Sequence, residues 1–246
     1  MARSSTFARV YFPLTLLVGA AGLGLTLCVL YHALIVLDPH MPDGSFAIFA
    51  PPETPQANPM KLYDSYRIFF VHLPCALTTA LMSMVMAAAG VLYLISRHRR
   101  WDALLMAAVE VGAVTCLLTM VTGYIWGDFA WGKGWTWEPR LTSTLILWLS
   151  FIALMMIRGA VEDERKKRMF SAVYGLATVP LYPLVSRSIE MFGRMSHPES
   201  LESLLRVNEI SELSAVAKPA LILFFLFFLM VRYWQLRLAG NIRELR

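Results

Sequence analysis

Charged residues are scarce in this chain, and so are cysteines. Only 16% of the 246 residues are charged and 57% are hydrophobic, whereas about 25% of an ordinary soluble domain is charged. The three cysteines form no Cys-x-x-Cys pair, so thiol–disulfide exchange, a zinc site and covalent haem attachment are unsupported. The chain also has no Gly-x-x-x-x-Gly-Lys-Ser/Thr phosphate loop, and therefore no motif for nucleotide hydrolysis.

Long apolar runs take the place of charge, and a membrane-spanning helix needs roughly 20 mostly apolar residues. We therefore predict an all-α, polytopic membrane helix bundle with six transmembrane helices, forming one domain over residues 1–246. The first run is expected to be an uncleaved span, because its Ala-Gly-rich stretch lies inside it and not at its end. The runs are Val10–Leu37, Ile68–Ile95, Leu104–Ile125, Leu141–Ile157, Phe170–Val185 and Ala215–Trp234.

The basic residues fall mostly in alternate loops, so the net charge of +5 carries topology information and does not indicate nucleic-acid binding. The positive-inside rule places both termini in the cytoplasm. The loops of about 38–67, 126–140 and 186–214 then face the periplasm. The cytoplasmic set holds 14 of the 22 Lys and Arg residues: Arg3, Arg9, Arg97, Arg99, Arg100, Arg158, Arg165, Lys166, Lys167, Arg168, Arg232, Arg237, Arg243 and Arg246.

The second periplasmic loop is rich in tryptophan. Four of the seven tryptophans lie within twelve residues, at Trp126, Trp131, Trp135 and Trp137. An aromatic belt places Trp at both membrane surfaces, but it does not explain such a concentration in one loop. Glycines at Gly127, Gly132 and Gly134 alternate with the indoles and allow sharp turns and close approach of a ligand.

These tryptophans are expected to form a flat apolar shelf at the outer surface. An extended backbone would put Trp135 and Trp137 on one face, whereas a helix would pair Trp131 with Trp135. A shelf of this kind suits a planar apolar ligand such as a porphyrin. Candidate partners for its carboxylates are Arg140, Lys133 and, from the first loop, Arg67, because arginine forms a two-point contact with a carboxylate.

Two histidines are candidate haem ligands, because haem iron is commonly held by His. His72 lies at the outer end of the second span and His197 in the third periplasmic loop. His98 is set aside as a solvated cytoplasmic residue. His40 is open as an outward loop residue, and a lone His within a span, such as His32, usually hydrogen-bonds a neighbouring helix.

The tryptophan segment, followed by Arg140-Leu141-Thr142-Ser143, resembles the tryptophan-rich "WWD" signature of the CcmC family, the haem exporter protein C of System I cytochrome c biogenesis. Glu138 stands where that signature usually closes with Asp. The segment Ser65–Pro74 is similar to the family's segment around its first axial histidine. Ser188–Pro198 is similar to the segment around the second, with one residue more between Glu190 and His197.

The resemblance implies a haem-handling subunit of cytochrome c maturation, not an enzyme. It implies haem b held non-covalently and transiently at the periplasmic face, with His72 and His197 as axial ligands. The cofactor-binding residues it implies are Trp126, Gly127, Trp131, Gly132, Trp135, Trp137, Glu138, Arg140 and Arg67. The implied partners are the haem chaperone CcmE, the ABC transporter subunits CcmA and CcmB, the small membrane protein CcmD and membrane lipid.

Three other classes stay open from the residues alone. A transporter or channel for a non-haem substrate would need ionisable residues along a midplane path, for which Glu110 and Lys218 are candidates. An electron-transfer cytochrome b anchor would bury histidine pairs at mid-membrane, where only His32 fits. A structural assembly subunit would bind no haem at all.

Overall fold

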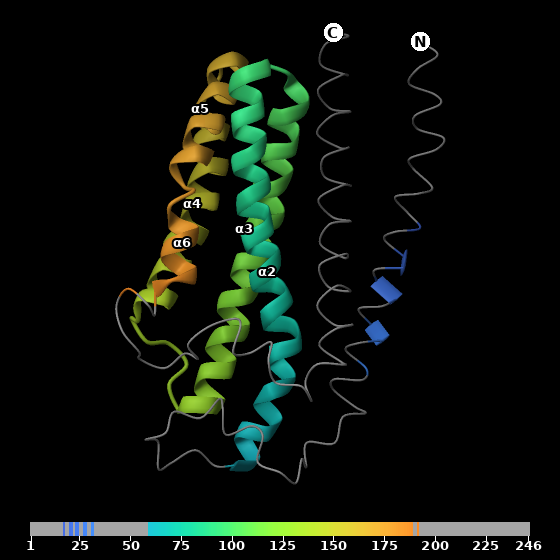
Figure 1. The fold of residues 1–246 in the computed structure, drawn as a ribbon, viewed down its shortest axis with the longest axis vertical. Helices are drawn as coiled ribbons and strands as arrows, with labels where there is room; N and C mark the ends of the chain where they lie inside the picture. Colours follow the sequence, from blue (N-terminus) through green and yellow to red (C-terminus); the bar gives the residue numbers. More distant parts are fainter. Residues whose placement is uncertain are drawn as a thin grey trace.

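The structure is a computed structural model of the chain. It describes residues 59–188 (for residues 59–67, 69, 70 and 129–131 the backbone alone), Met191 and eight positions between 17 and 31. All regular structure in this part is α-helical (Figure 1). The longer elements are Pro59–Ser96 (α2), Arg99–Trp131 (α3), Pro139–Ala160 (α4), Glu164–Ala177 (α5) and Leu181–Ser186 (α6).

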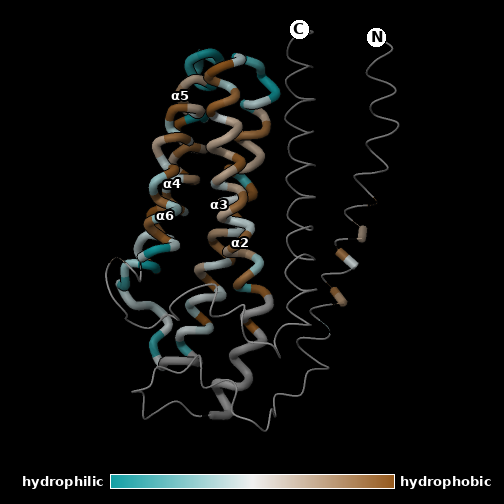
Figure 2. Tube along the Cα trace, in the orientation of Figure 1, coloured by the Kyte–Doolittle hydropathy of each residue, from teal (hydrophilic) through white to brown (hydrophobic). Residues whose placement is uncertain are grey.

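Four segments of this part are long and apolar enough to cross a membrane: Val71–Ser96, Arg99–Asp128, Pro139–Ala160 and Glu164–Ser186. They coincide with the second to fifth predicted spans, which confirms the all-helical, membrane-spanning character of this region. Figure 2 shows brown, apolar stretches along the helices and teal, polar residues at the turns that join them. The first predicted span is described only at scattered positions, and the sixth lies outside the described residues.

The fifth span differs from the prediction because it is interrupted. The run Phe170–Val185 was expected to form one helix, but α5 ends at Ala177 and α6 begins at Leu181. The reason is Pro180, which has no N–H to donate and whose ring clashes with the carbonyl four residues earlier in a continuous helix. Thr178 donates its hydroxyl to the Gly175 carbonyl at 2.8 Å and so satisfies one acceptor at the break.

Helices α2 and α3 are much longer than the apolar runs that predicted them. α2 has 38 residues and α3 has 33, or roughly 57 and 50 Å at about 1.5 Å per residue. The hydrocarbon core of a bilayer is about 30 Å thick, and α4, with 22 residues, is close to that length. α2 and α3 therefore project beyond the end of the bundle where α4 begins and α6 ends (Figure 1).

Successive long segments run antiparallel, so the turns alternate between two ends of the bundle. The turns at 97–98 and 161–163 share one end, and the tryptophan segment lies at the other. At the first end Arg158 donates from both terminal nitrogens to the two carboxylate oxygens of Asp102, each at 2.6 Å, and also to Ser171 at 2.9 Å. Asp102 is 7% exposed, and this network ties α3, α4 and α5 together.

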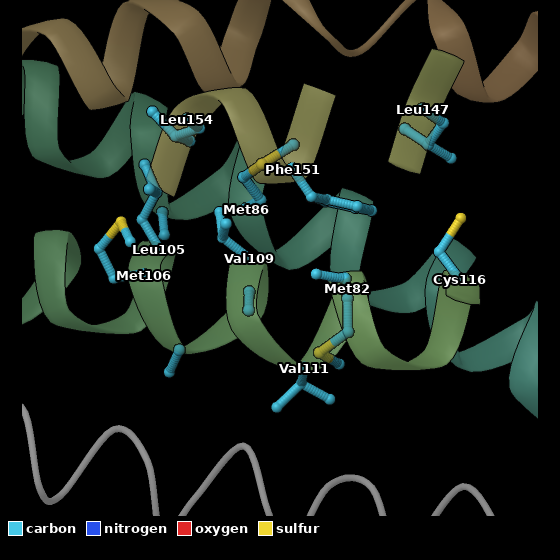
Figure 3. Close-up of a cluster of buried hydrophobic side chains, with 14 of the residues drawn as sticks. Met82, Met86, Leu105, Met106, Val109, Val111, Cys116, Leu147, Phe151 and Leu154 are labelled. Atoms are coloured by element: carbon cyan, nitrogen blue, oxygen red, sulfur yellow. The ribbon is translucent and has the colours of Figure 1, made fainter. Parts of the chain in front are cut away.

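The core lies where α4 and α5 pack on the α2–α3 pair. Gly112 lets Phe151 pack directly on α3, because a Cβ there would lie 2.9 Å from the Phe151 ring. Gly90 brings α2 against α5 in the same way, 3.1 Å from the Ala172 carbonyl. Small residues allow such close approach of helices in membranes. Figure 3 shows the larger side chains that fill the remaining space: Met82, Met86, Leu105, Met106, Val109, Val111, Cys116, Leu147, Phe151 and Leu154.

Candidate functional site

The tryptophan segment is half helix and half irregular chain. Trp126 lies within α3 and Trp131 is its last residue, so the predicted loop of 126–140 shortens to residues 132–138. Gly132 ends the helix in the left-handed conformation (φ 67°, ψ 16°), and its N–H donates to the Asp128 carbonyl at 3.0 Å. This is the usual glycine cap of a helix. Gly127 is buried within α3.

His72 packs on α3 where both helices leave the bundle. It lies roughly 36 Å along α2 from Ser96, at about 1.5 Å per residue, a little beyond the start of α4. Its Nδ1 is 3.0 Å from the Thr122 hydroxyl oxygen, and its ring centroid is 6.0 Å from that of Trp126, with the planes at 48°. Trp126 is only 5% exposed, so histidine and indole form a partly buried pair.

Gly134, which follows the end of α3, packs against the side chain of Tyr124 in that helix. A Cβ at this position would lie 2.6 Å from Cζ of Tyr124 and within 2.9 Å of both ring carbons beside it. The glycine backbone therefore rests on the face of the tyrosine ring. The sequence predicted that these glycines allow close approach of a ligand, but Gly134 instead makes a close contact with Tyr124 of the same chain.

Trp135 and Trp137 meet edge to face. Their ring centroids are 5.7 Å apart and their planes make an angle of 84°, a favoured geometry for an aromatic pair. Trp137 is 75% exposed, whereas Trp135 is partly buried. These two indoles therefore do not lie in one plane and do not form the expected flat shelf.

Glu138 and Arg140 frame the start of α4. Glu138 precedes the helix in extended conformation (φ −65°, ψ 151°), with Pro139 at the first helical position, a favoured arrangement. The Glu138 side chain is buried at 6% exposure and interacts electrostatically with Arg140. Arg140 also donates from Nη2 to the Ser186 carbonyl at 3.4 Å, so it reaches the end of α6.

Two buried polar atoms in this region have no hydrogen-bond partner among the described residues. They are Nε1 of Trp135, which can only donate, and Oγ1 of Thr142. Such atoms are rare in folded proteins and call for a reason. A ligand with an acceptor edge would satisfy them, and the propionates of a haem have this chemistry. The donor of Trp135 and the Trp135–Trp137 pair therefore have the chemistry to meet a planar apolar group with an anionic edge.

Some predicted site residues cannot be placed. Arg67 lies in the helical backbone of α2 and Trp131 in that of α3, without described side chains, and His197 lies outside the described residues. Thr122 and Tyr124 contact the predicted site residues and were missed from the sequence. Thr122 precedes Trp126 by four residues, so both lie on one face of a helix that contains them. This spacing could have indicated Thr122, but the predicted third span ended at Ile125, before Trp126. Among the described residues, no group of three His, Cys, Asp or Glu side chains could hold a metal ion.

These features define a multi-pass helical membrane protein with aromatic side chains and a histidine gathered at one end of the described helices. A model of the family CcmC, Heme exporter protein C, matches residues 13–244. The chain belongs to this family, which confirms the resemblance found in the tryptophan segment.

Proteins with similar sequences carry names of the same family. The chain is 33% identical over 135 residues to the Heme exporter protein C of Bradyrhizobium diazoefficiens, covering 55% of this chain and 51% of the relative. It is 30% identical over 156 residues to that of Haemophilus influenzae, covering 63% and 61%. It is 30% identical over 138 residues, 56% of this chain and 58% of the relative, to a putative cytochrome c biosynthesis ccmC-like mitochondrial protein of Marchantia polymorpha. The chain thus spans half to three fifths of the length of these relatives.

Proposed function

We propose that this protein binds haem b non-covalently and transiently at the projecting end of α2 and α3, and delivers it to the chaperone CcmE for maturation of c-type cytochromes. The observation that carries the proposal is the placement of His72. A histidine held by a hydrogen bond beside a buried indole is a suitable axial ligand for haem iron. Membership of the Heme exporter protein C family supports haem as the bound group.

His72 and His197 are the proposed axial ligands. Trp126, Trp131, Trp135 and Trp137 form the proposed apolar contacts, with Gly127, Gly132 and Glu138 shaping the segment that carries them. Arg140 and Arg67 are the proposed partners of the propionates, whose charge would otherwise be costly near a bilayer. The orphan donor of Trp135 and the hydroxyl of Thr142 lie in the same segment and supply further polar contacts.

The contact of Arg140 with Ser186 links the proposed haem site to the end of α6. Arg140 holds the end of α6 through a single hydrogen bond of 3.4 Å, which is long and therefore weak. A propionate would be a stronger partner, because a bond between guanidinium and carboxylate is charge-assisted. Binding at this site thus competes with the α4–α6 contact and couples the site to the segment that leads to His197.

The proposed setting is a bacterial inner membrane, crossed by six helices with both termini in the cytoplasm. Periplasmic segments of about 38–67, 126–140 and 186–214, which include the projecting ends of α2 and α3, carry the site and its approaches. CcmA, CcmB and CcmD are the proposed partner subunits in addition to CcmE, and lipid surrounds the bundle. The role is one of transport and handling, with no catalytic residue and no nucleic-acid partner assigned.

The test is the absorbance spectrum of the purified protein, alone and with CcmE. We expect a haem spectrum of a bis-histidine type in the wild-type protein, and its loss or conversion in His72→Ala and His197→Ala. His98→Ala is the matched control, because His98 is exposed at the opposite end of the bundle. Unchanged haem spectra in both site variants would refute the ligation. A haem-free wild-type protein that still supports cytochrome maturation would favour a structural assembly subunit.

A further inference from the structure

Thr122 of α3 makes a direct contact with the ring of His72. The two atoms involved, Nδ1 of His72 and Oγ1 of Thr122, are 3.0 Å apart across the α2–α3 interface, in a partly buried position. The residues are 50 positions apart in the chain, so this contact exists only in the folded helix pair.

The direction of this hydrogen bond follows from the other contact of Thr122. A threonine hydroxyl has one proton and two acceptor lone pairs. The Thr122 oxygen lies 2.6 Å from the carbonyl of Leu118, which can only accept, and 3.2 Å from the carbonyl of Thr119. The shorter contact favours donation to the Leu118 carbonyl, and in that arrangement Thr122 accepts from His72. Nδ1 of His72 carries the hydrogen, and Nε2 carries the lone pair that a metal requires.

Two neighbours of Thr122 fix the plane of the same ring. A Cβ on Gly123 would lie 3.0 Å from Cε1 of His72, so the imidazole fills the space that the glycine leaves. Trp126 closes another side at a centroid distance of 6.0 Å. Three residues of α3 thus contact the His72 ring, and the contact with Thr122 favours the Nδ1–H tautomer.

We propose that Thr122 is a positioning residue for His72, which holds the imidazole in the Nδ1–H tautomer and presents Nε2 to the haem iron. This inference rests on the proposed function, in which His72 is an axial ligand. Hydrogen bonds to the second nitrogen of a ligating histidine raise its basicity as well as orient it. Thr122 offers a neutral hydroxyl in place of the carboxylate used in many permanent sites. A neutral acceptor strengthens the ligand less, which suits a haem that must later be released.

The experiment compares Thr122→Val, Thr122→Ser and Thr119→Val in the full-length protein. Valine keeps the shape of threonine and removes the hydroxyl, whereas serine keeps the hydroxyl. Thr119→Val is the matched control, because Thr119 donates a similar back-bond to the Thr115 carbonyl at 2.8 Å, one turn away from His72. Two quantities are measured: the His72 tautomer by ¹⁵N NMR of the haem-free protein, and the rate of haem loss to excess apomyoglobin.

For Thr122→Val we expect a smaller fraction of the Nδ1–H tautomer and haem loss faster by about 10- to 100-fold, the usual effect of removing such a contact. Thr122→Ser should restore both quantities to near the wild-type values, and Thr119→Val should leave them unchanged. If Thr122→Val does not yield folded protein, Thr122→Ala, which is smaller and favours helix, gives the same comparison.

Failure of this inference differs from failure of the proposed function. If His72→Ala abolishes the haem spectrum while Thr122→Val matches the wild type in tautomer and rate, Thr122 does not position the ligand. The same conclusion follows if Thr122→Ser and Thr119→Val are as impaired as Thr122→Val. If His72→Ala keeps its spectrum, ligation by His72 is wrong and the inference falls with it, whatever the tautomer measurement shows.

Discussion

Gly134→Ala tests whether the segment that carries Trp135 and Trp137 depends on contact with α3. The added Cβ would lie 2.6 Å from Cζ of Tyr124, whereas carbon atoms in favourable contact are about 3.5–4.0 Å apart. The overlap of roughly 1 Å must be relieved by moving the backbone or the ring. Overpacking of this size costs about 1–3 kcal/mol, so we expect the free energy of unfolding to fall by that amount.

The double variant Tyr124→Ala/Gly134→Ala makes this prediction specific. Tyr124 is 50% exposed, so Tyr124→Ala alone should cost about 1 kcal/mol. In the double variant the ring is gone and the methyl group has room, so the cost of Gly134→Ala should largely disappear. A coupling free energy of about 1–3 kcal/mol is therefore expected from the double-mutant cycle. The assay is SDS titration of the haem-free protein in mixed micelles, followed by tryptophan fluorescence.

Gly132 supplies the control. A Cβ at Gly132 meets nothing within 4 Å, but its φ of 67° is unfavourable for other residues. Gly132→Ala should cost about 1–2 kcal/mol through the backbone alone, Gly132→Asn should cost less, and Tyr124→Ala should rescue neither. If Gly134→Ala is neutral, or if its cost persists without the Tyr124 ring, the close contact between this segment and α3 is wrong.

Three further predictions concern single side chains. Trp126→Ala should destabilise the protein by about 3–5 kcal/mol, because this indole is 5% exposed. Trp137 is 75% exposed, so Trp137→Ala should change stability by less than about 0.5 kcal/mol. Equal effects of the two variants in the SDS titration would contradict the burial of Trp126 and the exposure of Trp137. Arg158→Ala should cost about 3–5 kcal/mol by leaving the buried carboxylate of Asp102 unpaired, and the further change Asp102→Asn should recover part of that loss; a cost below 1 kcal/mol would refute the buried pair. Hydrogen bonds from the backbone N–H groups of Lys166 and Arg165 lower the pKa of Asp163. The ionised Asp163 side chain therefore stabilises the folded protein fully above the ordinary Asp pKa, and this contribution is lost as pH falls through the lowered pKa. Asp163→Asn keeps a capping side chain and should therefore flatten the dependence of Tm on pH below pH 4, and an unchanged dependence would be evidence against it.

The second to fifth spans were predictable because a bilayer requires long apolar helices, and hydropathy alone finds them. Their ends were not. Hydropathy placed the end of the third span at Ile125, since Gly127 and Asp128 lower the local average, but backbone geometry continues α3 to Trp131. The break in the fifth span followed from Pro180, a local signal that the apolar run concealed.

The sequence named candidate site residues, which stay a prediction, but not the contacts among them. The clustering of Trp126, Trp135 and Trp137 marked the segment, and the resemblance to the CcmC family marked His72. The contact of His72 with Thr122 and Trp126 was not predictable, because it depends on the register of α2 against α3. The edge-to-face angle between Trp135 and Trp137 likewise depends on how Gly134 seats the chain on Tyr124.

The projection of α2 and α3 beyond the bundle means that one helix pair is held together in two different solvents. Within the bilayer, lipid is as apolar as the side chains, so the α2–α3 pair is stabilised by close packing of Gly112 against Met82 and by the hydrogen bond between Thr79 and Thr115. His72 and Trp126 lie one and two residues inside the ends of the apolar segments, at Val71 and Asp128, so we expect the bilayer surface beside them, where burial of the indole from water gains hydrophobic free energy that the lipid-embedded half lacks. The site should therefore loosen in urea and on cooling, as aqueous cores do, while the spans below it respond to the choice of lipid.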